Sequence, residues 1–572
     1  MPKADFPARG LFPTKYFLIT GNVKEESLDK ISKSFKKDED VRKLFVDEDL
    51  NDLDRAVYLL NQGSEIQRCS VFNNLKQLLV DEGDEGVKAI AESLSDILWK
   101  LDEDIQIACA KSILSITSLL NEVSTGYLFP IITTMTGLKN KTVADEWNEV
   151  LIMSMDKVEM EIVEKYIKIG TELGDINENE SNRVLACRLL GAITKRIDPG
   201  KVLDYLPLLQ GLCQDTDASV REAMCEQIGI IAPKIGYKNT VAKMDDTSIA
   251  DELLELLQDE EKAVKIAAFK TLIDLLDLFE DDFRHIRIFP IIKSLILNND
   301  QTLYRLFVQA FGKIMYKMRK KIICDESLIS LCCNFYKASS LKTDGRLRAQ
   351  CAYNFPGILV TIGKKRYEKY LHSIFVKLAT DSYAISRITI AKAFHEICKI
   401  LGKPLSVKYL YPTLKIMLKD NNLEVKESLF VHINIVLDSF LSNDHTANSE
   451  IFPPLIPLFL KYNSIITTNW RRQVGMLKHY KHYPKYFTPD EIHKFFIPIL
   501  FKYLEFGAAP TREDASVCIV IHTRALANNS KQVEIYNQLK EKFGRGRSFW
   551  LRLTFIKICK HTLDSFSHNF FK

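Results

Sequence analysis

What the sequence lacks excludes several classes of protein. No apolar run approaches the roughly 18 residues that a membrane-spanning helix needs. The amino-terminal stretch MPKADFPARGLFPTKYF has no apolar signal-peptide core. The formal net charge of +4 is small for 572 residues and gives no case for nucleic-acid binding. We therefore expect an intracellular, soluble protein that binds neither membrane nor nucleic acid.

The residue patterns of enzymes and metal sites are also missing. The 12 cysteines include no Cys-x-x-Cys pair, and most lie in apolar stretches, so we expect buried thiols rather than disulfides. There is no Ser/His/Asp spacing, no phosphate-binding loop and none of the Asp, His and Asn motifs of a metallophosphatase. His479 and His482 are three residues apart, but neighbouring lysines would repel a metal ion. We expect no catalysis, no cofactor and no metal.

What the sequence does contain is a repeat. The stretches QDTDASVREA (214–223), QDEEKAVKIA (258–267) and KDNNLEVKES (419–428) share one spacing of Asp, Val and Arg or Lys. The basic residue recurs every 39 to 45 residues, and prolines keep the same register. A fixed period of about 20 to 50 residues indicates stacked repeats. The basic series is Arg221, Lys265, Arg305, Arg348, Arg387, Lys426, Arg471, Arg512 and Arg552, and the prolines are Pro207, Pro290, Pro412, Pro457 and Pro498.

Each period predicts a pair of helices. Apolar residues after Val264 and Val425 follow the spacing of one helix face. A second apolar stretch with an early proline, such as IFPIIKSLIL at 288–297, precedes the acidic turn. One repeat of roughly 40 residues cannot bury enough apolar surface alone, so neighbours must stack. The pattern resembles the HEAT repeat, and we expect an all-α fold, an α-solenoid of about a dozen HEAT repeats.

The domain boundaries follow from where this pattern holds. We expect residues 1–43, which are polar and charged, to form a mobile amino-terminal arm and residues 44–572 to form the solenoid. The stretch 125–165 fits the pattern least well. A solenoid needs a polar capping repeat, whereas this chain ends in DSFSHNFFK. We therefore expect that the carboxy-terminal capping repeats are lacking, as in a fragment or a short isoform.

The acidic and basic markers predict a structural ladder between repeats. Asp in the turn can accept the N–H groups that open the next helix. The basic residue six positions later lies on the flank of that helix, where it could pair with the turn Asp of a neighbouring repeat. One exposed pair is weak, but a series of them would fix the register of the repeats. The predicted ladder residues are Asp215, Arg221, Asp259, Lys265, Asp420 and Lys426.

The stretch NWRRQVG at 469–475 stands out. Trp470 takes the position that Val has in other repeats, and Arg471 and Arg472 follow it. Trp and Arg are enriched at the binding hot spots of interfaces. Two interpretations of Trp470 stay open: a large side chain that fills a gap between helices, or a contact with a partner. For Arg472, which is outside the basic series, we expect partner contact.

Three stretches carry a more specific resemblance: VDEDLNDLDRAVYLL (46–60), CAYNFPGILV (351–360) and GRGRSFWLRLTFIKIC (544–559). They resemble the regulatory subunit 4 family of serine/threonine-protein phosphatase 4, which is similar to the scaffold subunit of protein phosphatase 2A. The resemblance extends over nearly all of residues 44–571. It implies a non-catalytic cytoplasmic subunit that holds and directs a metallophosphatase catalytic subunit.

The resemblance also implies where the partner binds. In the scaffold relatives, the turns between the two helices of each repeat form a ridge that grips the catalytic subunit, and a repeat with a Trp-Arg pair takes part. Carried over to this chain, and with Arg472 added from the residues themselves, the expected phosphatase-binding residues are Trp470, Arg471, Arg472, Thr511, Arg512, Trp550 and Arg552.

We therefore expect a regulatory scaffold that binds a phosphatase 4-type catalytic subunit and limits which substrates reach its active site. Self-association is not expected. The alternative is a HEAT-repeat adaptor or a transport receptor of the importin type. Such receptors are usually strongly acidic, and the calculated pI of about 8.2 argues against that alternative. The sequence does not indicate the substrates, or whether phosphatase activity rises or falls.

Overall fold

The computed structural model describes residues 50–565 except 244–246, 299 and 527. The predicted arm at 1–43 and the final stretch 566–572 lie outside the described residues. The described part of the chain consists of helices and turns and contains no β-strand. The predicted fold class is confirmed: the chain is an all-α solenoid of HEAT repeats.

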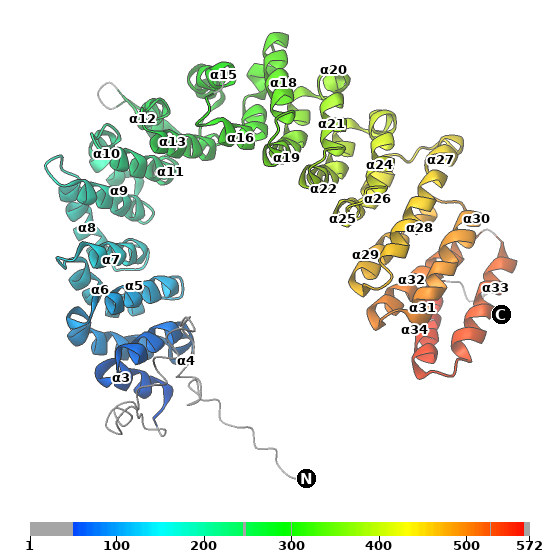
Figure 1. Cartoon of the computed structure of the whole chain (residues 1–572), viewed down its shortest axis with the longest axis horizontal. Coiled ribbons are helices and arrows are strands. Elements are labelled where there is room, and N and C mark those ends of the chain that lie inside the picture. The colour runs from blue at the N-terminus through cyan, green and yellow to red at the C-terminus, as the bar shows by residue number, and fades with distance from the viewer. Residues whose placement is uncertain (1–49, 244–246, 299, 527, 566–572) are drawn as a thin grey trace, which may run out of the picture. The chain divides into compact units, whose positions relative to one another are not determined.

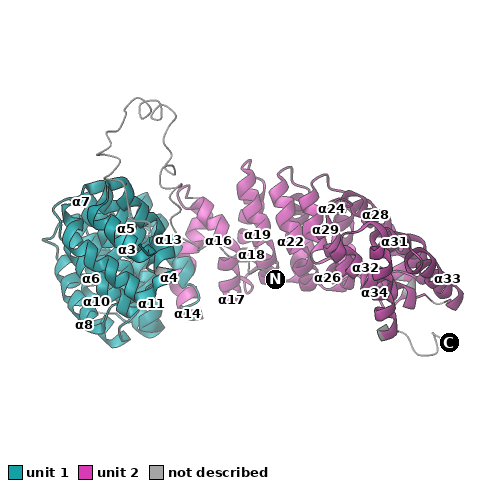
Figure 2. Ribbon diagram, turned by 90° about the horizontal axis from the view of Figure 1, so that it is seen from below, with its two compact units in different colours: residues 1–280 teal, residues 281–572 magenta. Residues whose placement is uncertain are grey.

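The chain divides into two compact units, residues 1–280 and 281–572 (Figure 2). Within each unit, consecutive helices form pairs, and each pair packs on the next (Figure 1). We call the two members of a pair the first and second helix. The second helices pack directly on one another, for example α9 on α11 in unit 1 and α19 on α22 in unit 2.

Unit 1 begins with α3 (Asp52–Gln62) and α4 (Glu65–Ile97). Gly83 has a φ of 63° and divides α4 into helices of two successive repeats. The unit continues with η1 (Leu98–Lys100), α5 (Glu103–Ile116), α6 (Glu122–Thr136), α7 (Lys141–Ser154), α8 (Met160–Leu173), α9 (Glu180–Thr194), α10 (Pro199–Cys213), α11 (Ala218–Val241), α12 (Ile249–Leu256) and α13 (Lys262–Leu275).

Unit 2 repeats the arrangement with more broken first helices. Its second helices are α16 (Tyr304–Lys317), α19 (Gly345–Ile362), α22 (Ala384–Leu401), α25 (Leu423–Phe430) with α26 (Ile433–Asp438), α29 (Trp470–Tyr480), α32 (Ala509–Arg524) and α34 (Phe549–Ser565). Its first helices are α14 (Asp281–Phe283) to α15 (Phe289–Asn298), α17 (Arg319–Ile322) with α18 (Glu326–Ser340), α20 (Tyr367–Tyr370) with α21 (His372–Ala379), α23 (Lys403–Leu405) to α24 (Tyr411–Leu418), α27 (His445–Ile451) with α28 (Ile456–Ile465), α30 (Pro489–Glu491) to α31 (Ile497–Phe506), and α33 (Asn529–Leu539).

The breaks in the first helices have a local cause. Pro290, Pro412 and Pro498 each stand second in an α-helix that follows a π-helical turn. Proline lacks the N–H that would donate to the residue four positions earlier, so the hydrogen-bond pattern shifts at this point. The recurrent proline therefore bends the first helix in these repeats.

Glycine ends several second helices. Gly363 after α19 and Gly402 after α22 have φ values of 83° and 77°, which side chains with a Cβ rarely adopt. Both glycines lie in the connection to the first helix of the following repeat. They let the chain reverse there, so that the next pair packs against the previous one.

The core lies between the helix layers. Val220, Val264 and Val425, the valines of the repeated motif, are fully buried. The cysteines are all free thiols, and most are buried, as the sequence predicts. In the part of the chain that the structure describes, no helix has both the length and the apolar character needed to cross a bilayer.

Candidate partner-binding ridge

Arginine side chains connect the turns of successive repeats. Arg348 is the fourth residue after Asp344, the N-cap of α19. Its Nε and Nη2 donate to the Asp381 carboxylate of the next turn at 2.7 and 2.9 Å. Its Nη1 donates to the carbonyl oxygens of Lys342 and Thr343 in its own turn at 2.9 and 2.7 Å. One guanidinium therefore holds two turns together in the bidentate geometry that arginine favours.

The same contact recurs, and we call each instance a rung. The acidic partner stands two residues before the N-cap of the next second helix, and its Oδ1 also accepts the N–H of that N-cap residue. Among the described residues, each unit has two rungs: Arg183–Asp215 and Arg221–Asp259 in unit 1, and Arg348–Asp381 and Arg387–Asp420 in unit 2.

The rungs shift the pKa values of their carboxylates. Hydrogen bonds from Arg221 lower the pKa of the Asp259 carboxyl below its usual 3.8, against the opposing effect of burial. For Asp381, burial is the largest single influence and raises the pKa, but Arg348 and the backbone N–H of Tyr383 together outweigh it. The pKa values of Asp215 and Asp420 are lowered by the same balance. The rung carboxylates are therefore ionised at neutral pH.

This gives a pH prediction. A carboxylate whose pKa is lower in the folded state stabilises that state above its unfolded pKa of about 3.9, and the stabilisation disappears as the pH falls through the folded pKa. The urea midpoint of unfolding should fall steeply below about pH 4. In Asp381→Asn, which cannot ionise, the fall should be smaller, whereas Asp344→Asn at an exposed pair should follow the wild type. A fall of equal size in Asp381→Asn and the wild type would contradict the conclusion that Asp381 has a lowered pKa in the folded state.

The two lysines of the predicted ladder behave differently. Lys265 lies near Asp259 of its own turn and forms no ion pair with another described residue. Lys426 is 5% exposed, and its pKa is lowered first by burial and then by Lys461. The next turn places Thr467 where a rung would need Asp. Lysine also lacks the planar fork that bridges two turns, so these positions are not rungs.

The structure corrects the register at Trp470. The N-cap of α29 is Asn469, so the rung position belongs to Gln473 and the valine position to Arg472. Gln473 is buried and donates to the carbonyl oxygens of Ile466 and Thr467. The prediction that Trp470 takes the valine position is therefore wrong. Trp470 is instead the first residue of its helix and is 39% exposed.

Two predicted binding residues make contacts between repeats. Thr511 is fully buried, and its hydroxyl donates to Gln473 Oε1 at 3.2 Å, so its side chain cannot contact a partner. Arg472 forms an ion pair with Glu427 of the preceding repeat. These side chains connect repeats, and we leave both out of the candidate binding surface.

Exposed aromatic side chains mark the last three turns that the structure describes. They stand at the turns before α29, α32 and α34, which pack side by side (Figure 1). Phe506 occupies the position that Asp has in a rung. We call this surface the aromatic ridge: Trp470, Phe506, Phe549 and Trp550, with exposed fractions of 39%, 78%, 61% and 56%.

Arginines lie against these rings. The Arg471 guanidinium carbon is 4.6 Å from the ring centroid of Trp470. The guanidinium carbon of Arg512 is 5.8 Å from the ring of Trp550, while its Nη1 donates to the carbonyl of Gly507 at 2.9 Å. Arg512 therefore keeps the contact of a rung with its own turn but faces a tryptophan, not a carboxylate. The positive charge of each guanidinium is attracted to the ring beside it, and both tryptophans remain exposed.

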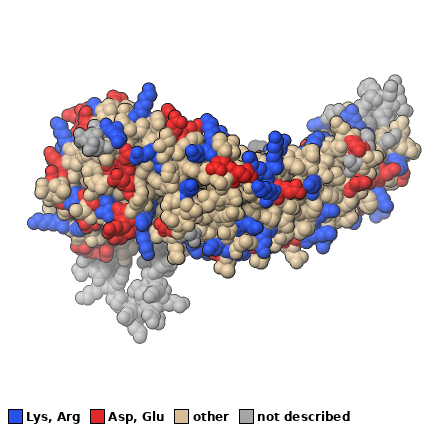
Figure 3. All heavy atoms as spheres, turned by 90° about the horizontal axis from the view of Figure 1, so that it is seen from above, with Lys and Arg blue, Asp and Glu red and all other residues tan. Residues whose placement is uncertain are grey.

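Arg552 lies in the same register. Its Nη1 donates to the carbonyl oxygens of Gly546 and Arg547 at 3.0 and 2.9 Å. Arg545 and Arg547 of this turn are exposed, so the ridge combines aromatic and basic side chains. On the face shown in Figure 3, Lys and Arg are interspersed with Asp and Glu.

The sequence analysis missed Phe506 and Phe549, and it missed Asp381 and Gln473 of the inter-repeat contacts. A signal was present for Phe506, because the turn FGA has no Asp where a rung requires one. The described residues contain no cluster of three His, Cys, Asp or Glu side chains placed to hold a metal ion. His479 is largely buried, and its pKa is lowered to about 4, chiefly by burial.

Comparisons with known proteins agree with this architecture. The HEAT-repeat family model matches residues 206–235, which include the second half of α10, the turn with Asp215 and most of α11. Serine/threonine-protein phosphatase 4 regulatory subunit 4 of Mus musculus is 27% identical and that of Homo sapiens 28% identical, each over 95% of this chain. The chain spans 65% of the length of these relatives. The resemblance derived from the three sequence stretches is thereby confirmed.

More distant likenesses define the fold alone. Regulatory subunit 1 of the same phosphatase, from Homo sapiens, is 24% identical over 39% of this chain and 23% of its own length. Among solved structures, importin beta has a TM-score of 0.58 at 10% identity over 89% of this chain and 69% of its own. The Kap95:Nup1 complex has a TM-score of 0.51 at 13% identity, over 89% and 67% respectively. Both structures share the solenoid fold with this chain.

Proposed function

We propose that this chain is a non-catalytic regulatory scaffold of a phosphatase 4-type serine/threonine phosphatase and that the aromatic ridge binds the catalytic subunit. The observation that carries the proposal is the change in the turns along unit 2. The turns before α22 and α25 carry rung aspartates, whereas the turns before α29, α32 and α34 carry exposed aromatic side chains. A change from internal contacts to exposed rings suits a surface that binds another protein.

The two regulatory subunit 4 relatives support the choice of partner, because each is named as a regulatory subunit of phosphatase 4. Binding along several turns would hold the catalytic subunit against unit 2 and restrict which substrates reach its active site. The importin-type alternative has no comparable support, since its likeness to this chain is confined to the fold.

The experiment that tests the proposal is direct binding of the purified chain to a purified phosphatase 4 catalytic subunit, measured by biolayer interferometry. We expect saturable binding, and the double variant Trp470→Ala/Arg471→Ala should weaken it by about tenfold. No binding by the wild type would overturn the proposed function. Equal binding by wild type and variant would overturn only the assignment of Trp470 and Arg471 to the interface.

A further inference from the structure

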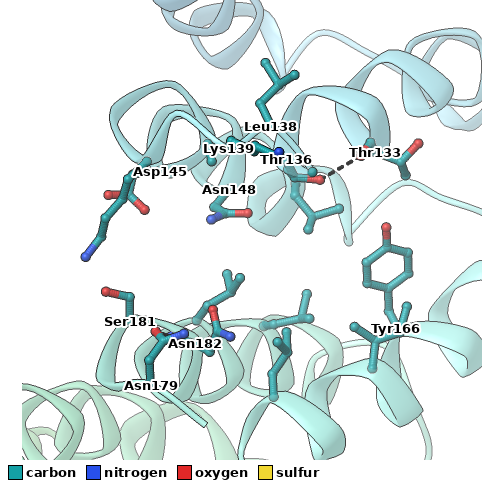
Figure 4. A pocket seen from close by; sticks show the side chains of 18 of the residues that line it. Thr133, Thr136, Leu138, Lys139, Asp145, Asn148, Tyr166, Asn179, Ser181 and Asn182 are labelled. Carbon is teal, nitrogen blue, oxygen red and sulfur yellow. Dashed lines mark hydrogen bonds between the residues drawn. The ribbon is translucent and has the colours of Figure 1, made fainter.

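A groove of about 780 Å³ lies in unit 1, between α7 and α9, and residues of α6 and α8 also line it (Figure 4). Asn148 of α7 and Asn182 of α9 project into it from opposite walls, and Tyr166 of α8 lies at one end. The volume is within the range of about 300–1,000 Å³ that is usual for ligand sites. We call it the α7–α9 groove.

The groove lies where a rung is absent. The N-cap of α7 is Asn140, so Ala144 stands at the rung position, and its methyl group cannot reach the next turn. The N-cap of α9 is Asn179, so Asn177 stands at the position of the rung aspartate. Both partners of the Arg–Asp contact are thus missing from this pair of repeats. The groove therefore stays open at the end where α7 and α9 begin, next to their turns.

The rest of the repeat interface is well held. Arg188 Nη2 of α9 donates to Glu149 Oε2 of α7 at 2.6 Å. Arg196 Nη1 donates to the carbonyl of Met155 at 3.1 Å. In the layer of first helices, the rings of Phe129 and Tyr166 meet edge to face at 5.7 Å. These contacts keep the two repeats in register beside the groove, so the groove is preformed.

The walls offer groups that suit a peptide backbone. The half-buried Asn148 amide forms no hydrogen bond within the described part of the chain. Asn182 Nδ2 donates to Glu178 Oε2 at 2.7 Å, which leaves its amide oxygen as an acceptor. Each peptide unit brings one donor and one acceptor that must stay paired on burial, and side-chain amides supply both. Leu151 and Leu185 line the groove beside these amides and provide an apolar contact.

The charges of the lining are balanced. Lys139 and Lys141 lie on the α7 side, together with Asp145, and Glu180 lies at the start of α9. Two positive and two negative side chains do not favour a polyanion or a strongly basic segment. They complement a segment that carries little net charge.

We propose that the α7–α9 groove binds an extended peptide segment of a partner protein, which carries near-zero net charge and inserts one apolar side chain against Leu151 and Leu185. The amides of Asn148 and Asn182 pair with the backbone of that segment. This site goes beyond the proposed function, because it shares no residue with the aromatic ridge and lies in the other unit.

The test uses a phage library of random dodecapeptides, panned on the purified chain with counter-selection on the double variant Ala144→Arg/Asn177→Asp. This variant reinstates the pair of residues that forms a rung elsewhere and should close the turn end of the groove. We expect enriched peptides of low net charge with a shared apolar residue. Their synthetic forms should bind the double variant at least about tenfold more weakly than the wild type.

Two further variants keep the result interpretable. Asn148→Ala leaves the groove open and should weaken peptide binding by about fivefold to tenfold, since it removes a backbone partner. Ala263→Arg makes the same change as Ala144→Arg at an exposed position of α13 and should change the affinity by less than about twofold. The proposal is overturned if no peptide is enriched, or if the enriched peptides bind the wild type, Ala144→Arg/Asn177→Asp and Asn148→Ala equally.

Discussion

Replacing Arg348 with alanine should destabilise the repeats around α19 and α22 by about 3–5 kcal/mol. The Asp381 side chain is 2% exposed and that of Arg348 is 13% exposed, so the variant leaves a buried carboxylate without its cation. The carbonyl oxygens of Lys342 and Thr343 lose their donor at the same time. Amide hydrogen exchange read by mass spectrometry should show protection in α19 and α22 reduced about a hundredfold or more.

The chain contains a matched control. Arg305 also pairs with an aspartate of the next turn, Asp344, at 2.9 Å, but its side chain is 76% exposed. Arg305→Ala should therefore cost less than about 1 kcal/mol. Removing the charge of the partner as well, in Arg348→Met/Asp381→Asn, should restore much of the lost protection, because Asn keeps the acceptor for the N–H of Tyr383. Equal losses of stability in Arg348→Ala and Arg305→Ala would show that burial of a rung adds nothing to its contribution to stability.

The fold could be predicted because its requirements are local and repeated. A buried valine one turn into the second helix, an acidic turn before it and a proline in the first helix each satisfy a need of a single repeat, and all recur at one period. Arg221, the example from which the ladder was derived, does pair with Asp259 of the next turn. Lys265 and Lys426 satisfy the same spacing, but spacing cannot distinguish a forked guanidinium from an ammonium group.

The register error at Arg471 has a clear origin. The basic series was aligned by charge, and the rung position of this repeat holds Gln473, which is uncharged. The spacing of the basic series instead points to Arg471, two residues earlier. The turn and the short helix α27 (His445–Ile451) make this repeat longer than the others. Arg471 therefore falls within the usual spacing from Lys426, although the true rung position lies two residues further on.

The candidate binding side chains were harder to predict, because their exposure depends on a helix register that charge spacing alone does not fix. Thr511 and Trp550 occupy comparable places near the starts of α32 and α34, yet one is buried and the other is 56% exposed. The helix register explains the difference: Thr511 is the third residue after the N-cap Ala508 and so stands at the buried valine position, whereas Trp550 stands two residues before Arg552, one position earlier in the register. The weak repeat signal at 125–165 did coincide with a structural feature: Ala144, at the position of the missing rung, lies within it.

Replacing Trp550 with alanine should weaken binding of the phosphatase catalytic subunit by about thirtyfold or more, if the proposed function holds. Trp550 packs edge to face against Phe549, with ring centroids 5.2 Å apart, and Arg512 lies beside its ring. These contacts hold the exposed indole in place before a partner arrives, so little side-chain entropy is lost on binding. The loss should appear mainly as faster dissociation in surface plasmon resonance.

The same tryptophan truncation at Trp99 is the control. Trp99 is 50% exposed, lies in unit 1 and has Lys100 over its ring at 4.7 Å, so it matches Trp550 in exposure and in its cationic neighbour. Trp99→Ala should change the affinity by less than about twofold, and both variants should unfold at the wild-type temperature, since neither ring is in the core. If both variants bind as the wild type does, exposed aromatic turns are not what holds the catalytic subunit. If both lose affinity equally, the contact is not confined to the aromatic ridge, because two similar rings in different units would then contribute alike.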